Sequence, residues 1–384
     1  MMRHSFVCLS WAVCLLCGLS LIPETRGQSS IVALESRIID LVADHSNSLV
    51  RVSAARELAE EGQPARVIIG TGFFVSGKGH VLTNASTVAI HERIWLEHRG
   101  VEYAATLIGF DRATNLAVLL ADTLPPDFGF LHLSDAAELP QMGQMLIRMS
   151  MPMRLGPTPR LTMVGGIESS VGNQLFPCNY IRVTHAAGPG EGGAAYLDLT
   201  GRLVGIQVGT LNEIDSSYVL PARAAMRVRD DLFSTGAVEF GWMGFEVRNV
   251  SSIALGQHLA LAIVEPDTPA YEAGLMPDDI LLQIGDYSVS SIDELRNAMF
   301  YTRVGQFVEV EVLRDNEPVA LTVKLAKRPS NEPLQVLRPV AIPTVANPRR
   351  EDALTDEPSP LLPKKSLLPE EEIRDDVSLE SPGS

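Results

Sequence analysis

The stretch Gly70-Thr71-Gly72-Phe73-Phe74-Val75-Ser76, followed by His80-Val81-Leu82-Thr83-Asn84-Ala85, decides how this chain of 384 residues folds. Each half is a short run of β-branched and aromatic residues, and polar residues and glycine separate the two, as in strands joined by a turn. Similar runs surround it at 49–52, 67–75, 80–83, 93–96, 102–109 and 116–120. A second series lies at 145–149, 162–169, 180–184, 194–197, 203–208 and 218–221. Two sets of about six short strands predict a mainly β protein with paired barrels.

Two flanking segments complete this unit. The Pro-rich stretch Leu124-Pro125-Pro126-Asp127 lies between the two sets of strands, where a linker is expected. Before the first set, residues 31–42 carry apolar side chains at helical spacing, which predicts a short amphipathic helix.

A further unit begins near Phe240. It has a glycine-rich entry, a predicted helix at 292–300 and closing strands at 308–313 and 319–325, with Asp315-Asn316 as the turn between them. From residue 329 to 384 the chain is rich in Pro, Glu, Asp and Ser without sustained periodicity, which predicts a disordered tail. Its leucine pairs at 361–362 and 367–368 are read as solvated linker, with docking motifs as the alternative.

The first 27 residues have the pattern of a targeting signal. Arg3 and His4 precede an apolar run from Phe6 to Ile22, and small residues follow near Gly27. A run this short, followed by polar sequence, predicts a cleaved secretory signal and therefore a periplasmic or secreted protein, with a retained anchor as the alternative.

Cysteine usage agrees with this. Cys8, Cys14 and Cys17 lie in the signal, so Cys178 alone would remain in the mature chain, where it cannot form an intramolecular disulfide. We expect Cys178 to be a buried small hydrophobe.

The charge of the chain and the spacing of its polar residues argue against two classes of ligand. The formal net charge is −16, which argues against a nucleic-acid partner because phosphate binding needs a clustered excess of Lys and Arg. No cluster of side chains has convincing metal-ligand spacing, so no metal or other cofactor is expected.

The opening stretch resembles the start of the HtrA family of trypsin-like serine proteases. The segments 111–119 (Asp-Arg-Ala-Thr-Asn-Leu-Ala-Val-Leu), 189–193 (Pro-Gly-Glu-Gly-Gly) and 201–206 (Gly-Arg-Leu-Val-Gly-Ile) support the match in order and spacing. The resemblance implies a trypsin-like double six-stranded β-barrel over residues 28–236.

That family cleaves peptides with a serine nucleophile, a histidine base and an aspartate that orients the histidine. The resemblance places Ser86 at the histidine position, Asn115 at the aspartate position and Gly192 at the serine position. Serine has no pKa near neutrality, asparagine has no charge and glycine has no side chain, so none of them can perform the family's step. We therefore expect the chain not to be an enzyme, but an inactive, degenerate member of the family.

The neighbouring loop departs from the family as well. Glu191 replaces an asparagine beside the amides that would bind an oxyanion, and a carboxylate pointing there would repel developing negative charge. The loop is also one residue shorter before Pro189, and Ala194-Ala195 replace Gly-Pro. A rescued active site built from Ser86 with His91 or His185 has no positive sign in the sequence.

Residues 238–328 resemble a PDZ domain of the HtrA kind. The resemblance rests on 241–245 (Gly-Trp-Met-Gly-Phe), 267–270 with 273–275, 277–281 and the helix around 293–295. It implies that a peptide C-terminus adds as an extra strand and that loop amides bind its carboxylate. The peptide-binding residues expected from it are Trp242, Met243, Gly244, Phe245, Val247, Leu295 and Met299, the last two being core residues in the alternative.

Three functions remain open from the sequence. The leading hypothesis is an exported, non-catalytic scaffold, chaperone-like binder or regulator that binds peptides or protein C-termini. The alternatives are a serine endopeptidase of the HtrA family and an inactive subunit of an oligomer with itself or with active relatives.

Overall fold

The computed structural model describes residues 26–55, 67–134, 138–252 and 256–328. The predicted signal, apart from its last two residues, and the predicted disordered tail lie outside the described residues. No helix among the residues that are described is long and apolar enough to cross a membrane.

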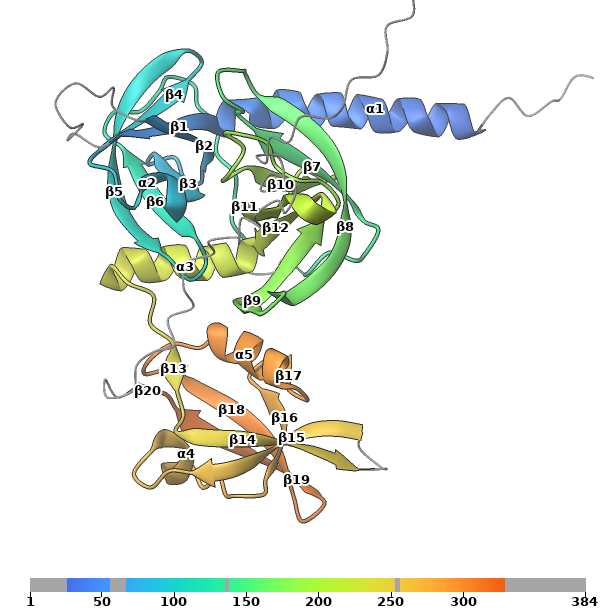
Figure 1. Ribbon diagram of the computed structural model, residues 1–384, viewed down its shortest axis with the longest axis vertical. Coiled ribbons are helices and arrows are strands. Elements are labelled where there is room, and N and C mark those ends of the chain that lie inside the picture. The colour runs from blue at the N-terminus through green and yellow to red at the C-terminus, as the bar shows by residue number, and fades with distance from the viewer. Residues whose placement is uncertain (1–25, 56–66, 135–137, 253–255, 329–384) are drawn as a thin grey trace, which may run out of the picture. The chain divides into compact units, whose positions relative to one another are not determined.

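The first six strands close into one barrel, in the order β1-β2-β3-β6-β5-β4 (Figure 1). They are β1 (Leu49–Ala55), β2 (Val67–Phe74), β3 (His80–Asn84), β4 (Arg93–His98), β5 (Val101–Asp111) and β6 (Leu116–Ala121), with the short helix α2 (Ala85–Val88) directly after β3. All seven residues of β1 are buried, since it lies between β2 and β4.

The next six strands close into a second barrel, in the order β10-β11-β12-β9-β8-β7. They are β7 (Met145–Ser150), β8 (Thr158–Val171), β9 (Gln174–Val183), β10 (Ala195–Asp198), β11 (Leu203–Leu211) and β12 (Ser216–Pro221). Two six-stranded barrels confirm the fold class expected from the strand pattern.

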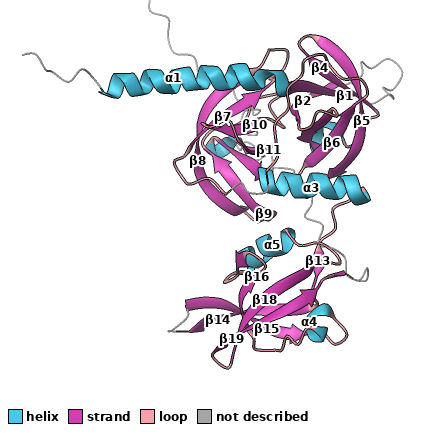
Figure 2. Ribbon diagram, turned by 180° about the vertical axis from the view of Figure 1, so that it is seen from behind, coloured by secondary structure: helices cyan, strands magenta, loops and turns pink. Residues whose placement is uncertain are grey.

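Two long helices flank the barrels (Figure 2). α1 (Arg26–His45) contains the predicted helix at 31–42, and α3 (Ala222–Thr235) contacts β5 and β6 of the first barrel and β11 and β12 of the second. Helix α3 was not predicted from the sequence, although Gly236, with φ 74°, ends it in the way that glycine commonly ends helices.

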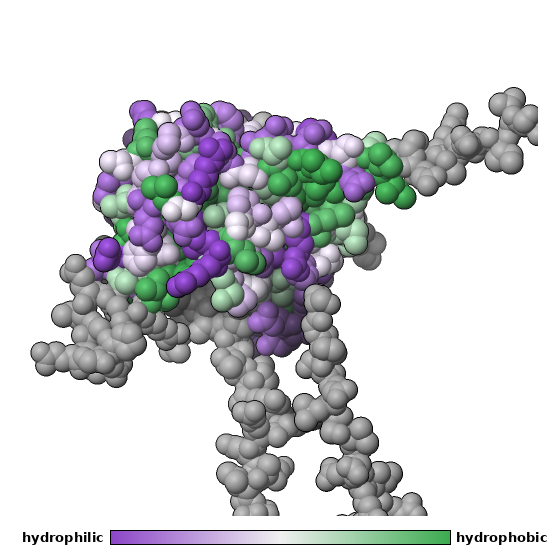
Figure 3. All heavy atoms as spheres, turned by 90° about the horizontal axis from the view of Figure 1, so that it is seen from above, coloured by the Kyte–Doolittle hydropathy of each residue, from purple (hydrophilic) through white to green (hydrophobic). Residues whose placement is uncertain are grey.

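Helix α1 is only partly covered. Leu41 is 1% exposed and belongs to a buried cluster with residues of both barrels, whereas Ile31 is 69% exposed. Figure 3 looks onto the face that carries α1 and shows apolar residues gathered around its N-terminal half.

The C-terminal unit is an open sheet in the order β14-β15-β16-β18-β19, together with the two-stranded sheet β13-β20. Its elements are β13 (Gly241–Trp242), β14 (Phe245–Ser252), β15 (Gly256–Val264), α4 (Pro269–Glu272), β16 (Ile280–Ile284), β17 (Tyr287–Ser288), α5 (Ile292–Phe300), β18 (Phe307–Arg314), β19 (Glu317–Lys324) and β20 (Ala326–Lys327). Helix α5 has the predicted bounds. β14 is an edge strand of this sheet.

Candidate functional site

The two barrels meet at a junction held by Thr71. Its amide donates to the carbonyl of Gly192 (2.8 Å), and its hydroxyl donates to the carbonyl of Gly190 (2.8 Å). The same hydroxyl accepts a hydrogen bond from the amide of Met151 (2.9 Å). One buried side chain in β2 therefore fixes two loops of the second barrel against the first.

Asn115 forms a second link across this junction. Its Oδ1 accepts from the amide of Ser86 (2.8 Å), at the start of α2, and its Nδ2 donates to the carbonyl of Val208 in β11 (2.7 Å). An aspartate could accept the first bond but could not donate the second. The amide at position 115 therefore joins both barrels, which nothing in the sequence pattern indicated.

Gly192 lies beside Asn84. Asn84 in turn precedes Ser86 by two residues. A Cβ placed on Gly192 would be 2.9 Å from the side-chain amide of Asn84. With its nitrogen toward Gln207, that amide donates to the carbonyl of Gln207 (2.7 Å) and accepts from the amide of Gly193 (3.3 Å). The three positions singled out from the sequence thus surround one junction, and Asn84 occupies the space beside Gly192.

Glu191 points inward, and its charge has a partner. Its carboxylate accepts hydrogen bonds from Nη2 of Arg148 (2.7 Å), from the hydroxyl of Ser150 (3.1 Å) and from the amide of Gly188 (2.6 Å). Glu191 and Arg148 are 5% and 1% exposed, so this is a buried ion pair. The pair ties the 188–193 loop to β7, and Arg148 was not among the candidates because β7 reads as an ordinary apolar strand.

The two candidate histidines have other surroundings. His185 Nδ1 lies 3.7 Å from Oδ1 of Asp215. Burial lowers the pKa of His185, and nearby Arg160 and Arg148 lower it further. His91 follows α2, where its amide donates to the carbonyl of Val88 (3.1 Å). Ser86 itself is exposed at the first turn of α2.

In the C-terminal unit, Gly244 leads into β14. It has φ 86°, a value that glycine adopts readily, and a Cβ there would be 2.4 Å from Cβ of Thr268. Its carbonyl accepts from the amide of Glu265 (3.0 Å). Glycine is therefore required at this position by both backbone conformation and space.

The other candidates divide between core and surface. Met243 is 2% exposed and belongs to the core of the unit, and Phe245, Val247, Leu295 and Met299 are half-buried against that core. Trp242 lies apart from them, in β13, opposite Ala326 of β20. The side chains from β14 and α5 thus share one apolar cluster.

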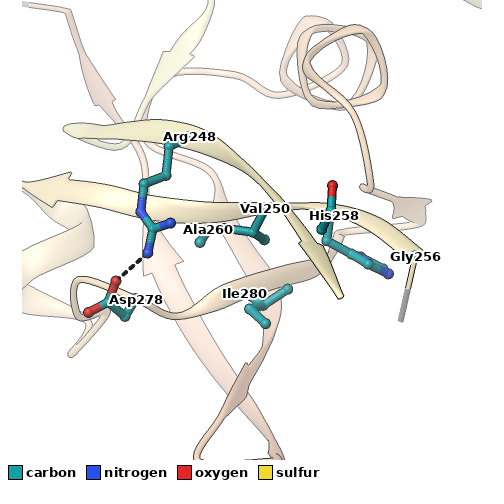
Figure 4. A pocket seen from close by; sticks show the side chains of 8 residues that line it. Arg248, Val250, Gly256, His258, Ala260, Asp278 and Ile280 are labelled. Carbon is teal, nitrogen blue, oxygen red and sulfur yellow. Dashed lines mark hydrogen bonds and ion pairs between the residues drawn. The ribbon is translucent and has the colours of Figure 1, made fainter. Parts of the chain in front are cut away.

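A separate pocket lies over β14, β15 and β16. Figure 4 shows Arg248 paired with Asp278 at one end of the pocket, with Nη2 and Oδ1 2.6 Å apart, beside apolar Val250, Ala260 and Ile280. Both charged side chains are at least half exposed, at 51% and 80%. An exposed pair of this kind adds little stability.

Within the described ranges, no three or more His, Cys, Asp or Glu side chains are grouped so that they could hold a metal ion.

Two protein families match separate parts of the chain. Residues 70–206 match the trypsin-like peptidase domain, and residues 241–325 match the PDZ domain.

Curated relatives share both parts. A protein of Marinomonas sp. (strain MWYL1), named "Probable periplasmic serine endoprotease DegP-like", is 32% identical over 292 residues, which cover 71% of this chain and 59% of that protein. A protein of the same name from Chlamydia trachomatis serovar D is 28% identical and covers 73% and 58%. This chain therefore spans somewhat more than half the length of these relatives.

Solved structures agree on the fold. The HtrA-type protease AlgW with a tripeptide is 26% identical, with a TM-score of 0.59 over 76% of this chain and 97% of that one. AlgW with a decapeptide is 25% identical, with a TM-score of 0.57 over 76% and 99%.

These findings contradict the expectation that the chain is not an enzyme. The relatives are named serine endoproteases, and residues 70–206 match a peptidase domain, so the comparisons point to an enzyme. The error lay in treating three positions, Ser86, Asn115 and Gly192, as sufficient to exclude activity. These three side chains exclude a serine, histidine and aspartate triad at these positions. They do not exclude catalysis by other side chains near the junction.

The chain has two closed barrels, followed in sequence by a PDZ domain. The relatives match this chain across both parts, and together these observations identify the family. The chain is an HtrA-like protein, made of a trypsin-like peptidase domain followed by a PDZ domain.

Proposed function

We propose that this protein acts in the periplasm and binds the C-terminal ends of other polypeptides between β14 and α5 of its PDZ domain. The free edge of β14 would pair with the incoming chain, and the loop 243–245 would bind its terminal carboxylate. Phe245 and Val247 would contact the side chains of the ligand from one side, and Leu295 and Met299 from the other.

The observation that carries this proposal is the backbone at Gly244. Gly244 has a positive φ, its carbonyl accepts from the amide of Glu265, and the loop 243–245 leads directly into β14, an edge strand. A loop held this way can direct amides at a carboxylate while the strand beside it remains available for pairing. Two solved relatives, which hold a tripeptide and a decapeptide, support the same reading.

The test uses the full-length protein and fluorescent decapeptides that end in different apolar residues. Fluorescence anisotropy should detect binding to at least one peptide, and amidation of its C-terminus should weaken that binding at least about tenfold, because charge-assisted hydrogen bonds are lost. Equal affinity for the free and amidated forms would overturn the proposal.

A pair of variants on one helix separates binding from folding. Leu295→Ala should weaken peptide binding, whereas Ile292→Ala, at a position that is 49% exposed on the same helix, should leave it unchanged. Thermal unfolding of both variants checks that each remains folded. Gly244 is unsuitable for this purpose, since any side chain there would collide with Thr268.

Serine endopeptidase activity is the second candidate, and the names of the relatives favour it. Any such activity needs a nucleophile other than residue 192, because glycine offers none. Casein turnover by the purified protein tests it, and Ser86→Ala tests whether the exposed hydroxyl takes part. If homogeneous protein does not cleave casein, the endopeptidase proposal is wrong.

Self-assembly, or assembly with active relatives, is a further part of the proposal. The exposed apolar residues on the N-terminal half of α1 favour it, because a surface of this kind is commonly covered by a partner. Light scattering on the mature protein measures its mass, and a strict monomer would count against this part.

A further inference from the structure

The pocket over β14, β15 and β16 lies on the face of the sheet opposite the PDZ core. Arg248 of β14 pairs with Ala260 of β15, and Ala260 pairs with Ile280 of β16. The neighbouring residues Leu259 and Leu281 are paired with each other and are fully buried in the core. Because successive side chains of a strand point to opposite faces, Arg248, Ala260 and Ile280 face away from that core. This outer pocket is therefore separate from the proposed peptide site between β14 and α5.

The outer pocket has a charged end and an apolar interior. In Figure 4, Arg248 and Asp278 lie together at one end, and Val250, Ala260 and Ile280 line the interior beside them. A hollow that is mostly apolar and carries a few placed polar groups is the usual form of a small-molecule site. Its charged end should orient a ligand, and its interior should take an apolar group.

The carboxylate of Asp278 is held in place by the backbone around it. The amide of Asp278 donates to the carbonyl of Leu261 (2.9 Å), and its φ is 71°. The following residue, Asp279, is 2% exposed and accepts a hydrogen bond from Arg314, with Nε and Oδ1 2.7 Å apart. The backbone of this turn is thus fixed at two successive residues, so a ligand can bind to Asp278 without ordering the turn first.

The two charges together select the class of ligand. Arg248 and Asp278 are bonded at 2.6 Å, so their combined charge is zero. A ligand that carries only a carboxylate is attracted by Arg248 but repelled by Asp278, and a ligand that carries only an amine meets the reverse. An α-amino acid has both charges on one carbon atom and can lie antiparallel to the pair. Both side chains are more than half exposed, and their bond involves one N–H group and one oxygen, so each can bind a ligand as well.

The volume of the pocket indicates the size of the apolar group. The pocket has a volume of about 130 Å³. An apolar protein cavity of about 150 Å³ can bind benzene. A branched aliphatic side chain, such as that of leucine, therefore fits beside Val250 and Ile280, whereas glycine would leave this apolar surface uncovered.

We propose that the outer pocket binds a free α-amino acid with an aliphatic side chain, for which leucine is the probe. Its carboxylate lies against Arg248, its ammonium group against Asp278, and its side chain against Val250 and Ile280. The end of a polypeptide cannot make the same contacts, because neither end carries both charges on one carbon atom. The outer pocket therefore binds single amino acids and not the polypeptides proposed for the groove.

The test measures leucine binding to the full-length protein at low ionic strength by saturation-transfer NMR, with three analogues as competitors. Leucinamide lacks the carboxylate, N-acetylleucine lacks the ammonium group and glycine lacks the side chain. Each should bind at least about tenfold more weakly than leucine, because it loses a charged contact or the apolar contact. If leucine does not bind, or if any analogue binds equally well, the inference is wrong.

Two conservative variants locate the binding site. Arg248→Gln and Asp278→Asn each remove one charge but keep a polar side chain, and asparagine tolerates the positive φ at position 278. Each should weaken leucine binding at least about fivefold. Lys327→Gln is the matched control, because Lys327 forms another exposed pair of this domain, with Glu239, and it should bind leucine as the parent does. Thermal unfolding checks that the variants remain folded, and equal effects of all three on leucine binding would contradict the site.

The peptide groove is the competing site for leucine. There, N-acetylleucine resembles the last residue of a polypeptide and should bind better than leucine, and Leu295→Ala should weaken both. That result would overturn the inference and leave the peptide proposal intact. Leucine binding that persists in Leu295→Ala and is lost in Asp278→Asn supports the outer pocket, whether or not the terminal decapeptides bind.

Discussion

Asn115 shows how one amide can serve two barrels. It accepts from Ser86 on one side and donates to Val208 on the other. Its backbone has φ 56°, a conformation that asparagine tolerates better than most residues. The side chain and the backbone conformation therefore both suit asparagine at this position.

One prediction concerns the amide of Asn115. Asn115→Asp should lower the free energy of unfolding by about 1–3 kcal/mol, because a carboxylate cannot donate to the buried carbonyl of Val208. Urea unfolding measures the change. Asn249→Asp, at an exposed position of β14, is the control and should cost less; equal losses would contradict this prediction.

The buried pair of Glu191 and Arg148 leads to a second prediction. Glu191→Ala should lower the free energy of unfolding by about 3–5 kcal/mol, because it leaves the Arg148 charge buried without a partner. Glu168→Ala is the control: its pair with Arg182 is about one-third exposed, and the expected loss is under about 1 kcal/mol. Urea unfolding measures both, and equal losses would argue against a special role for the buried pair.

At the scale of elements, the β8–β9 pair is interrupted where α5 meets it. The register passes from Glu168 opposite Tyr180 to Ser170 opposite Leu175, so the residues between Leu175 and Tyr180 leave the ladder. The amide of Asn179 donates to Oδ1 of Asn297 (2.9 Å), and Nε of Arg296 donates to the carbonyl of Phe176 (2.7 Å). Side chains of α5 thus satisfy backbone groups that the ladder leaves unpaired.

This arrangement predicts the effect of removing one side chain. Asn297→Ala should cost about 1–3 kcal/mol of stability, because the amide of Asn179 loses its acceptor in a buried setting. Hydrogen exchange at Asn179 should accelerate as well. Asn249→Ala, on the exposed part of β14, is the comparison, and it should change neither quantity.

Prediction from sequence succeeded for elements whose signal is local. All twelve barrel strands and α5 were predicted from apolar runs and turn residues, and α5 has the predicted bounds, whereas β8 and β9 begin four and six residues before the predicted runs. Helix α3 was not predicted because charged residues interrupt the apolar pattern of its buried face. One of them, Arg227, is buried and donates to Asp231. The roles of Asn84, Asn115 and Arg148 depend on partners far away in the chain, which no local pattern reveals.

At the scale of the whole molecule, acidity should weaken the fold before the carboxylates titrate. Burial lowers the pKa of His45, His80 and His98 from 6.5, so the folded protein binds fewer protons at these groups than the unfolded chain. Their contribution to stability is therefore present above pH 6.5 and is lost as the pH falls below it.

We expect the urea midpoint to fall steadily between pH 7 and pH 5. His98→Gln should make this dependence shallower, because its amide can still donate toward the carbonyl of Asn47 without becoming charged. A midpoint that is constant over this range, or equally steep in the variant, would show that other groups control the response.

The interrupted segment of β9 also carries Cys178, which is 1% exposed, and burial raises the pKa of its thiol. If residues 1–27 are removed as expected, it becomes the only thiol of the mature chain. A maleimide can then react only when this part of the second barrel opens, because both access and the thiolate are needed. The rate of labelling therefore reports local opening without an engineered cysteine, and a bound peptide that stabilises this region would be seen as slower labelling.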